Sequence, residues 1–344
     1  MNRAQVEEAR RKIDAEIAEL GIRILSLTSM RNTLAPIMSL PPELLIDIFM
    51  KIRVGGRTFT ERHRSRTTLF LSSVCSAWKD IILGSSKMWS VIDILHPEAV
   101  LAFLERSKQA DLVINLREID EQNYLCVGHI FHHLPRIRSL RLHGNWGEGP
   151  VEFPPSSWDT PAPILTALDI QYINLPSNPF SGISSSLRRL EFESCTLPST
   201  LLISSKITNL IVRIPHPRLH VDNLASILNQ MPSLSNLRLQ EALEPLQVSR
   251  SPNSISRISL PNLASLFLED FDSLLAVTLF LNVLEIPTST KLEISTTHDS
   301  HPSNGNGTIE QVLRAYATRG PFTGAWEIST LRVLQWERIT LIET

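Results

Sequence analysis

The apolar residues of the first 36 positions follow a strict heptad pattern. Positions recur at alternating intervals of four and three, and all but two of them are apolar. This spacing aligns the residues along one side of a helix, so it predicts an amphipathic helix over 1–36. We call this row the seam, and it consists of Val6, Arg10, Ile13, Ile17, Leu20, Ile24, Leu27, Arg31 and Leu34.

A seam of this kind has to be buried against another surface. The sequence leaves three interpretations open: the helix folds back on the module that follows, it self-associates as a coil, or it binds a partner protein. Gly21 interrupts the helix and costs about 1 kcal/mol relative to alanine. With about four heptads, a coil alone is marginal.

Two amphipathic stretches between 37 and 95 predict a small helical module. The first begins at Leu40-Pro41-Pro42-Glu43, because proline is tolerated in a first turn and glutamate suits its positive end. Its apolar stripe is Leu44, Leu45, Ile48 and Phe49. The second stretch ends at Gly84 and is followed by the bulky pair Met88-Trp89. Its apolar residues are Leu69, Leu71, Val74, Cys75, Trp78, Ile81 and Ile82.

A basic insert at 51–66 separates the two stretches. It contains one lysine and five arginines against the single acid Glu61. We interpret it either as a solvated insert or as a basic loop for an acidic or phosphorylated partner.

A second pattern, Leu-x-x-Leu-x-Leu, recurs from residue 137 onwards. Its middle leucine, the anchor, falls at 140, 168, 190, 210, 237 and 266, at intervals of 20 to 29 residues. A further copy is Leu331, Leu334 and Trp336, and a weaker candidate is Leu292 with Ile294. Two apolar residues that flank one position point to the same side of a strand. Parallel strands stacked in register therefore bury them as one core.

The residues between and beside these leucines point to the opposite face of the predicted sheet. They are mostly polar and mixed in charge, which indicates a recognition surface for a ligand that the sequence does not identify. The expected binding residues on this face are Arg141, His143, Asp169, Gln171, Arg189, Glu191, Glu193, Arg213, Arg238, Gln240, Phe267 and Glu269.

Loops and helices separate the repeats. The Gly/Pro-rich stretch 144–163 contains Trp146 and Trp158, and we expect these to pack against the core or to grip a partner. Helices are predicted at 99–109, 124–133 and 308–318, a second loop at 297–307, and a last strand over 328–339.

Composition and charge exclude several classes of protein. The net charge of −2 argues against a general nucleic-acid binder. Cys75, Cys126 and Cys195 are widely spaced and odd in number, which favours a reducing compartment. The N-terminus has no signal-peptide pattern, and the most apolar stretch, 273–286, is too short to span a bilayer. We expect a cytoplasmic or nuclear protein that binds neither nucleic acid nor membrane.

The sequence carries no recognised catalytic motif, neither a Walker loop nor a nucleophile elbow nor a zinc-protease helix. His298, Asp299 and His301 are more simply explained as solvated loop residues than as a metal site. His129 and His133 have no third ligand nearby in sequence, and Cys75 suits a small buried position. We therefore expect a protein that is not an enzyme, with no catalytic residue, cofactor or metal.

The module at 37–95 resembles an F-box. Leu40, Pro41, Glu43, Leu44, Leu45, Ile48 and Phe49 match its first half, and Val74, Cys75, Trp78 and Trp89 its second. Residues 187–197 resemble the leucine-rich-repeat consensus in full. The chain is most similar to the F-box-like proteins of mushroom-forming fungi, in which an N-terminal coil precedes the box and leucine-rich repeats follow it. The insert at 53–68 separates the two halves further than in a compact F-box.

The resemblance implies an α/β fold with an N-terminal helix (1–36), an F-box (37–95) and a leucine-rich-repeat solenoid (96–344) with parallel strands on its concave face. It also implies a substrate receptor that docks on the Skp-type adaptor of a cullin–RING ubiquitin ligase and binds a protein substrate through the repeats. The alternative is a scaffold protein with an F-box-like fold and no ligase role. The adaptor-binding residues that the resemblance implies are Leu40, Pro41, Leu44, Leu45, Ile48, Phe49, Val74, Trp78 and Ile82.

Overall fold

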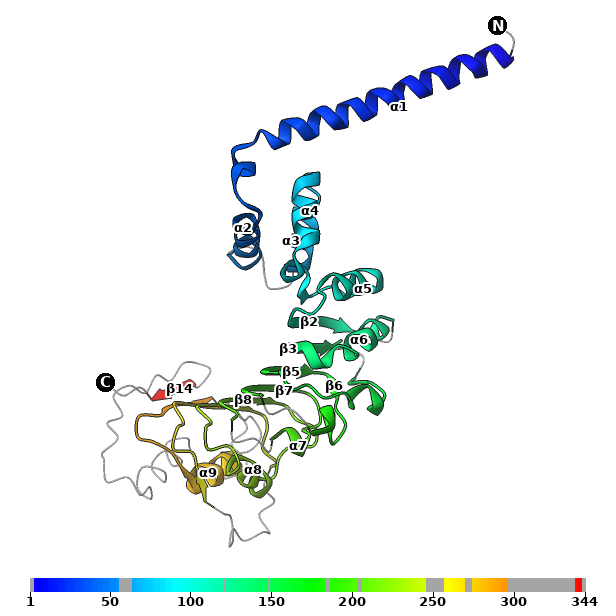
Figure 1. The fold of residues 1–344 in the computed structure, drawn as a ribbon. Coiled ribbons are helices and arrows are strands. Elements are labelled where there is room, and N and C mark those ends of the chain that lie inside the picture. The colour runs from blue at the N-terminus through cyan, green and yellow to red at the C-terminus, as the bar shows by residue number, and fades with distance from the viewer. Residues whose placement is uncertain are drawn as a thin grey trace. The chain divides into compact units, whose positions relative to one another are not determined.

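The structure, a computed structural model, is mixed α/β, with a long N-terminal helix and a mostly parallel sheet, as the sequence predicts (Figure 1). It describes residues 3–55, 64–120, 122–145, 147, 149–182, 186–202, 206–245, 257–269, 274–295 and 338–341. The chain forms two compact units. Unit 1 comprises Met1–Ile94 and Ala102–Ala110, and unit 2 comprises Leu95–Leu101 and Asp111–Thr344.

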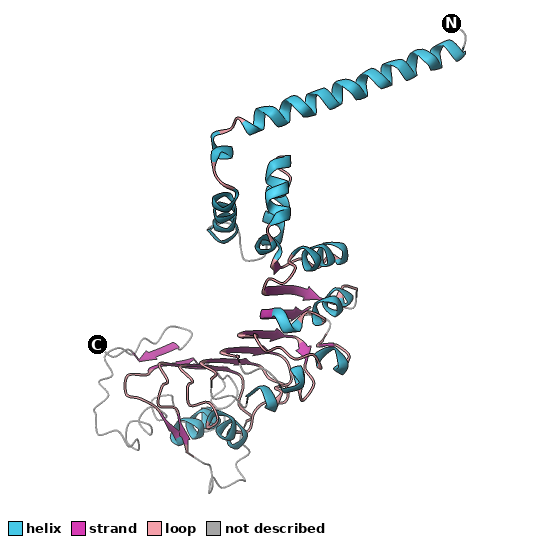
Figure 2. Ribbon diagram, in the orientation of Figure 1, coloured by secondary structure: helices cyan, strands magenta, loops and turns pink. Residues whose placement is uncertain are grey.

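Unit 1 is helical apart from one short strand (Figure 2). Its first helix, α1, carries the seam, and none of its residues is buried. The seam therefore has no covering surface in this structure. The described elements of unit 1 are α1 (Arg3–Thr33), α2 (Pro42–Gly55), α3 (Arg64–Ser72), α4 (Ser76–Gly84), two 3-10 turns (Pro36–Ser39 and Ser86–Trp89), β1 (Val91–Ile92) and the end of α5 (Pro97–Arg106).

Aromatic rings fill the core of unit 1. The rings of Phe49 and Trp78 lie 4.6 Å apart, and those of Trp89 and Phe103 lie 4.8 Å apart, measured between centroids. The indole nitrogen of Trp89 donates to the backbone oxygen of Ile82 at 2.9 Å, which satisfies its polar atom inside the core. The second amphipathic stretch forms two helices, α3 and α4, because the chain is extended at Cys75.

Buried and part-buried polar contacts tie α3 to the chain that closes unit 1. The carboxylate of Asp93 accepts from the backbone N–H groups of Arg64 and Ser65, at 2.8 and 2.9 Å, and so caps the first turn of α3. The hydroxyl of Thr68 donates to the backbone oxygen of Met88 at 3.1 Å. These contacts fix α3 by hydrogen bonds at positions where the sequence offers few large apolar side chains.

Arg53 corrects the prediction of a solvated basic insert. Its side chain is buried, and its Nη1 donates to the backbone oxygen of Lys87 at 3.2 Å. Its Nε and Nη2 have no hydrogen-bond partner. Burial lowers the pKa of Arg53 to about 10, against the opposing effect of the nearby Asp93 carboxylate. Arg53 belongs to α2 and Arg64 to α3, and the insert between 56 and 63 lies outside the described residues.

A mostly parallel sheet is the centre of unit 2. Its strands follow the order β2, β3, β5, β7, β8, β9, β11, β13, and β14 then pairs antiparallel to β13. They are β2 (Leu112–Ile119), β3 (Ile137–Gly144), β5 (Ala167–Gln171), β7 (Arg189–Glu193), β8 (Asn209–Arg213), β9 (Asn236–Gln240), β11 (Ser265–Glu269), β13 (Lys291–Ser295) and β14 (Arg338–Leu341).

Short helices and two minor strand pairs make the return segments between these strands. The strand pairs, both parallel, join β4 to β6 and β10 to β12. The return elements are α6 (Tyr124–Phe131), β4 (Val151–Glu152), β6 (Ile173–Asn174), α7 (Ser199–Leu202), α8 (Val221–Leu228), β10 (Ile258–Ser259), α9 (Leu274–Val283) and β12 (Leu284–Glu285), besides 3-10 turns at Leu134–Arg136, Pro155–Trp158 and Pro179–Gly182.

The anchor leucines align across the sheet, as the sequence predicts. Each pairs with the anchor of the next strand, in the order Leu140, Leu168, Leu190, Leu210, Leu237, Leu266 and Leu292. All of these anchors are buried, and so is the apolar residue two positions further along each strand. The weaker copy at Leu292 and Ile294 is therefore part of the same core, whereas the copy at 331–336 lies outside the described residues.

A left-handed residue follows β5, β7, β8 and β9 at one common register. Tyr172, Ser194, Ile214 and Glu241 have φ between 45° and 54°. The backbone N–H of each donates to the last residue of the next strand, as from Tyr172 to Glu193 at 3.0 Å. Gly144, the last residue of β3, occupies this register, and a Cβ there would clash with the backbone oxygen of Tyr172.

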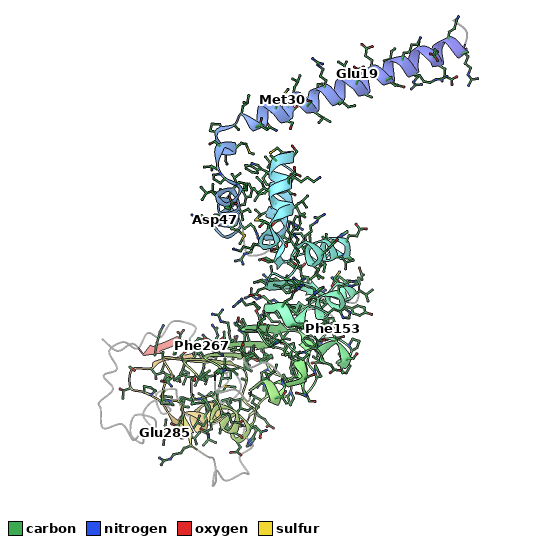
Figure 3. The ribbon with its side chains drawn as sticks, viewed as in Figure 1. Glu19, Met30, Asp47, Phe153, Phe267 and Glu285 are labelled. Atoms are coloured by element: carbon green, nitrogen blue, oxygen red, sulfur yellow. The ribbon has the colours of Figure 1, made fainter. Side chains whose placement is uncertain are left out.

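A tryptophan of the predicted loop at 144–163 packs into an aromatic cluster. Trp158 is fully buried, and its ring lies 4.6 Å from that of Phe131 and 5.7 Å from that of Phe180. Phe153, labelled in Figure 3, completes this aromatic cluster. Of the two interpretations of the loop, packing is the one that Trp158 follows. Trp146 lies outside the described residues, as do the predicted loop at 297–307 and helix at 308–318.

Replacing Gly144 tests the turn that ends β3. We expect Gly144→Ala to lower the free energy of unfolding by about 2–4 kcal/mol, because the new methyl group meets a backbone oxygen that cannot move alone. Gly128→Ala, in α6 with open space around it, is the control and is expected to be neutral or slightly stabilising. Urea unfolding of both variants measures the difference, and equal midpoints would contradict the close approach.

Candidate functional site

The polar face of the sheet carries three aligned rows of side chains. Strand pairing places the members of each row next to one another, one strand spacing of about 4.8 Å apart. The middle row runs Arg141, Asp169, Glu191, Ile211, Arg238 and Phe267. The third row runs His143, Gln171, Glu193, Arg213, Gln240 and Glu269. Arg189 lies in the first row and is exposed.

Asp169 is the buried centre of one cluster on this face. Its carboxylate accepts from Nε of Arg141 at 2.6 Å and lies 2.9 Å from Nε2 of His143. The amide of Gln171 donates to it at 3.3 Å. Burial alone would raise the pKa of Asp169, but the hydrogen bond and charge of His143, together with Arg141, outweigh burial and lower the pKa. The polar side chains of this cluster hydrogen-bond to one another, which fixes their positions.

Arg213 is the centre of a second cluster. Its Nη1 donates to Glu191 at 2.6 Å and to Glu193 at 3.2 Å, both on the neighbouring strand β7. Although burial opposes the charged form, the hydrogen bonds and charges of the two carboxylates raise the pKa of Arg213. As a result, the two carboxylates of β7 share one positive charge from the neighbouring strand.

The third feature, which we call the Arg238 patch, consists of Ile211, Arg238 and Phe267 on adjacent strands. The guanidinium carbon of Arg238 lies 4.0 Å from the ring centroid of Phe267, a cation–π distance. Its nearest carboxylate oxygen, on Glu269, is 4.0 Å away. The Nε of Arg238 is buried and has no hydrogen-bond partner. This patch combines apolar surface with hydrogen-bonding capacity that the protein leaves unused.

The predicted ligand-binding residues thus share one face but behave differently. Asp169, Glu191, Glu193 and Arg213 are engaged with one another or with neighbours, whereas Arg238 and Phe267 form the less satisfied patch. Sequence reasoning placed all of them on this face, and the alternating burial of the strands confirms that placement. The predicted binding residues did not include Ile211. It directly follows the anchor Leu210, and this same position after the other anchors identified the neighbouring binding residues.

The predicted adaptor-binding residues of unit 1 separate into core and surface. Leu45, Phe49 and Ile82 are fully buried. Leu40, Ile48 and Trp78 are half-buried, and Pro41 is exposed. Leu44 and Val74 are also exposed, at 49% and 48%.

Further apolar residues of unit 1 are exposed that the resemblance did not single out. Phe70 on α3 is 69% exposed, with Leu69 beside it, and Ile52 on α2 is exposed as well. Leu44, Ile48 and Ile52 are spaced by four and share one side of α2. We call Leu44, Ile52, Leu69, Phe70 and Val74 the exposed apolar set. Its members are large side chains in water on a module whose core is already filled.

The thiols of unit 2 are buried beneath this sheet. Burial raises the pKa of Cys195 to about 12 and also raises the pKa of Cys126, so neither is prepared as a nucleophile. Cys75, expected to be buried, is half-buried at the start of α4. Among the described residues, no three histidine, cysteine or acidic side chains gather as metal ligands.

Replacing Asp169 tests the buried cluster. Because the fold lowers its pKa, ionised Asp169 contributes stability that is present above its ordinary pKa, about 4, and is lost as the pH falls through the lower folded value. We expect Asp169→Asn to cost roughly 1–3 kcal/mol at neutral pH, with the difference from wild type shrinking below about pH 4. Denaturant unfolding at several pH values measures this. Asp159→Asn, at an exposed carboxylate, is the control, and a difference that persists unchanged into acid would contradict the ionic role.

Comparison with models of known protein families and with curated protein sequences gave no match. In the described part of the chain, no helix has both the length and the apolar character to cross a membrane.

Proposed function

We propose that this protein is the substrate-recognition subunit of a cullin–RING ubiquitin ligase. Unit 1 acts as an F-box that docks on a Skp-type adaptor, and unit 2 acts as a leucine-rich-repeat solenoid that binds a protein substrate. The protein breaks and forms no covalent bond itself. Holding the substrate beside the ubiquitin-loaded enzyme raises the effective concentration of the two reactants. This role places the protein in the cytoplasm or nucleus.

The observation that carries the proposal is the exposed apolar set on a module with a complete core. Leu45, Phe49 and Trp89 already fill the interior of unit 1, so Leu44, Phe70 and Val74 are not needed to close it. Large apolar side chains left in water on a small module are typical of a protein-binding surface. Leu44 and Val74 are also positions that match the F-box pattern, one in each half of the motif.

Two features of unit 2 support the substrate-binding part. The anchors recur at 20 to 29 residues, the period of leucine-rich repeats, and they pair in register across the sheet. The opposite face is formed by polar rows and the Arg238 patch. The patch suits a peptide that offers an apolar side chain next to a hydrogen-bond acceptor, because Phe267 supplies the first contact and Arg238 the second.

Point variants on the surface of unit 1 test the adaptor contact. We expect the full chain to co-purify with a recombinant Skp-type adaptor. Leu44→Asp with Val74→Asp should weaken binding roughly tenfold or more, because each buries an unpaired carboxylate at the contact. Leu125→Asp is the control, because Leu125 is an exposed leucine in unit 2, at 64% against 49% for Leu44. Thermal unfolding confirms that the variants remain folded.

Two outcomes would overturn the ligase assignment. If the wild-type chain fails to bind the adaptor, unit 1 is an F-box-like module without a ligase role, and the scaffold alternative takes its place. If Leu125→Asp weakens binding as much as the double variant, the contact does not involve the exposed apolar set.

A further inference from the structure

The seam of α1 is an unpartnered surface. Ile17, Ile24 and Leu27 are each more than half exposed, and no residue of α1 is buried. Figure 3 shows the side chains of α1, Glu19 and Met30 among them, standing free along the helix. A helix of this length gains most of its stability from packing of its apolar side, and Gly21 weakens it further. The seam therefore calls for a partner helix.

The heptad positions of the seam can be assigned from its spacing. An interval of three leads from position a to position d, so Ile17 and Ile24 occupy a, while Ile13, Leu20 and Leu27 occupy d. Both arginines of the seam, Arg10 and Arg31, fall at a positions. The uninterrupted apolar part of the seam is therefore the middle, with one arginine on each side of it.

A parallel pair of α1 helices is disfavoured by charge. In that arrangement each a residue faces the same residue of the second copy, so Arg10 meets Arg10 and Arg31 meets Arg31. The flanking g and e positions give no compensation. Glu16 at g faces Gly21 at e, and Arg23 at g faces Thr28 at e. A parallel dimer thus buries two like-charged pairs and gains no opposite-charged pair.

An antiparallel pair avoids this, because each a residue then faces a d residue. In the register that places Ile17 opposite Leu20, Ile13 lies opposite Ile24 and Arg10 opposite Leu27. The flanking g positions now face one another, and Glu16 lies opposite Arg23 of the second copy, twice by symmetry. No like charges face each other at the g or e positions in this register.

Charge also selects this register over its neighbours. A shift of one heptad in one direction places Arg23 opposite Arg23, and the opposite shift places Glu16 opposite Glu16 and Asp14 opposite Asp14. Only the central register makes the Glu16–Arg23 contacts. Each of the two alternatives replaces them with a repulsive pair at the flanking positions.

From this pattern we propose that α1 forms an antiparallel two-stranded coiled coil with α1 of a second copy of this chain, in the register that pairs Glu16 with Arg23. The inference concerns self-association alone and does not rest on the adaptor or the substrate. If it holds, each assembly carries two copies of unit 1 and two of unit 2, so that binding of any partner with two sites gains from linkage.

The first experiment measures the mass of the full chain in solution. We expect light scattering or sedimentation at micromolar concentration to give a dimer, twice the chain mass of 38.7 kDa. Ile17→Asp with Ile24→Asp should give a monomer. Ile22→Asp is the matched control, because Ile22 is as exposed as Ile24, at 70% and 64%, but lies off the seam. This control should remain a dimer. A monomeric wild-type chain, or a mass above that of a dimer, overturns the proposal.

The second experiment tests orientation by charge reversal. Glu16→Arg and Arg23→Glu should each raise the dissociation constant of the dimer roughly tenfold or more, because each creates two like-charged contacts. The double variant restores the opposite-charged pairs and should return to near the wild-type value. Recovery also shows that the single variants are not merely unfolded. A double variant as weak as the singles would exclude this register, because only the antiparallel pairing couples these two positions.

Discussion

The register of the parallel strands is the constraint on which the rest of unit 2 depends. The apolar residues at the anchor and two positions later are buried in each strand from β3 to β13. Because side chains alternate along a strand, a slip of one residue would bring the polar row into the core and the leucines into water. Because such a slip is costly, the strand register determines both which residues form the core and which form the polar face. Intervals between anchors differ, so the return segments absorb the variation and the strands do not.

The repeated backbone turn at the end of the strands adds to this constraint. Tyr172, Ser194, Ile214 and Glu241 share one register and one left-handed conformation, although they have no side-chain chemistry in common. A left-handed β-branched residue such as Ile214 is costly, so the conformation is imposed by the fold and not by local preference. For this reason the turn could not be predicted from residue types, whereas Gly144, which allows the close approach to Tyr172, is visible in the sequence.

The sequence predicted the core of unit 2 better than its surface chemistry. The anchors were found because a two-residue period is a local property of each strand. The burial of Asp169 was missed, because it depends on Arg141 and His143 of a neighbouring strand, 28 and 26 residues earlier in the chain. In unit 1, the sequence likewise could not show which of Leu69, Phe70 and Leu71 is buried, because this too depends on distant contacts. Three consecutive apolar residues cannot all face one core, and the choice of Leu71 follows from the Thr68 and Ser65 contacts.

The polar face of the sheet and the seam of α1 differ in how their charged side chains are paired. On the polar face of the sheet, most carboxylates are paired with a guanidinium, imidazole or ammonium group from the same or the next strand. Matched charges present little field to a distant partner. On α1 the seam arginines have no such match within the face they occupy. An isolated cation in an apolar seam penalises any partner that offers another cation at the same level, so it acts chiefly against wrong alignments. The pattern of α1 is therefore that of a helix selected for a particular partner geometry, and a second α1 running in the opposite direction meets that geometry within this chain.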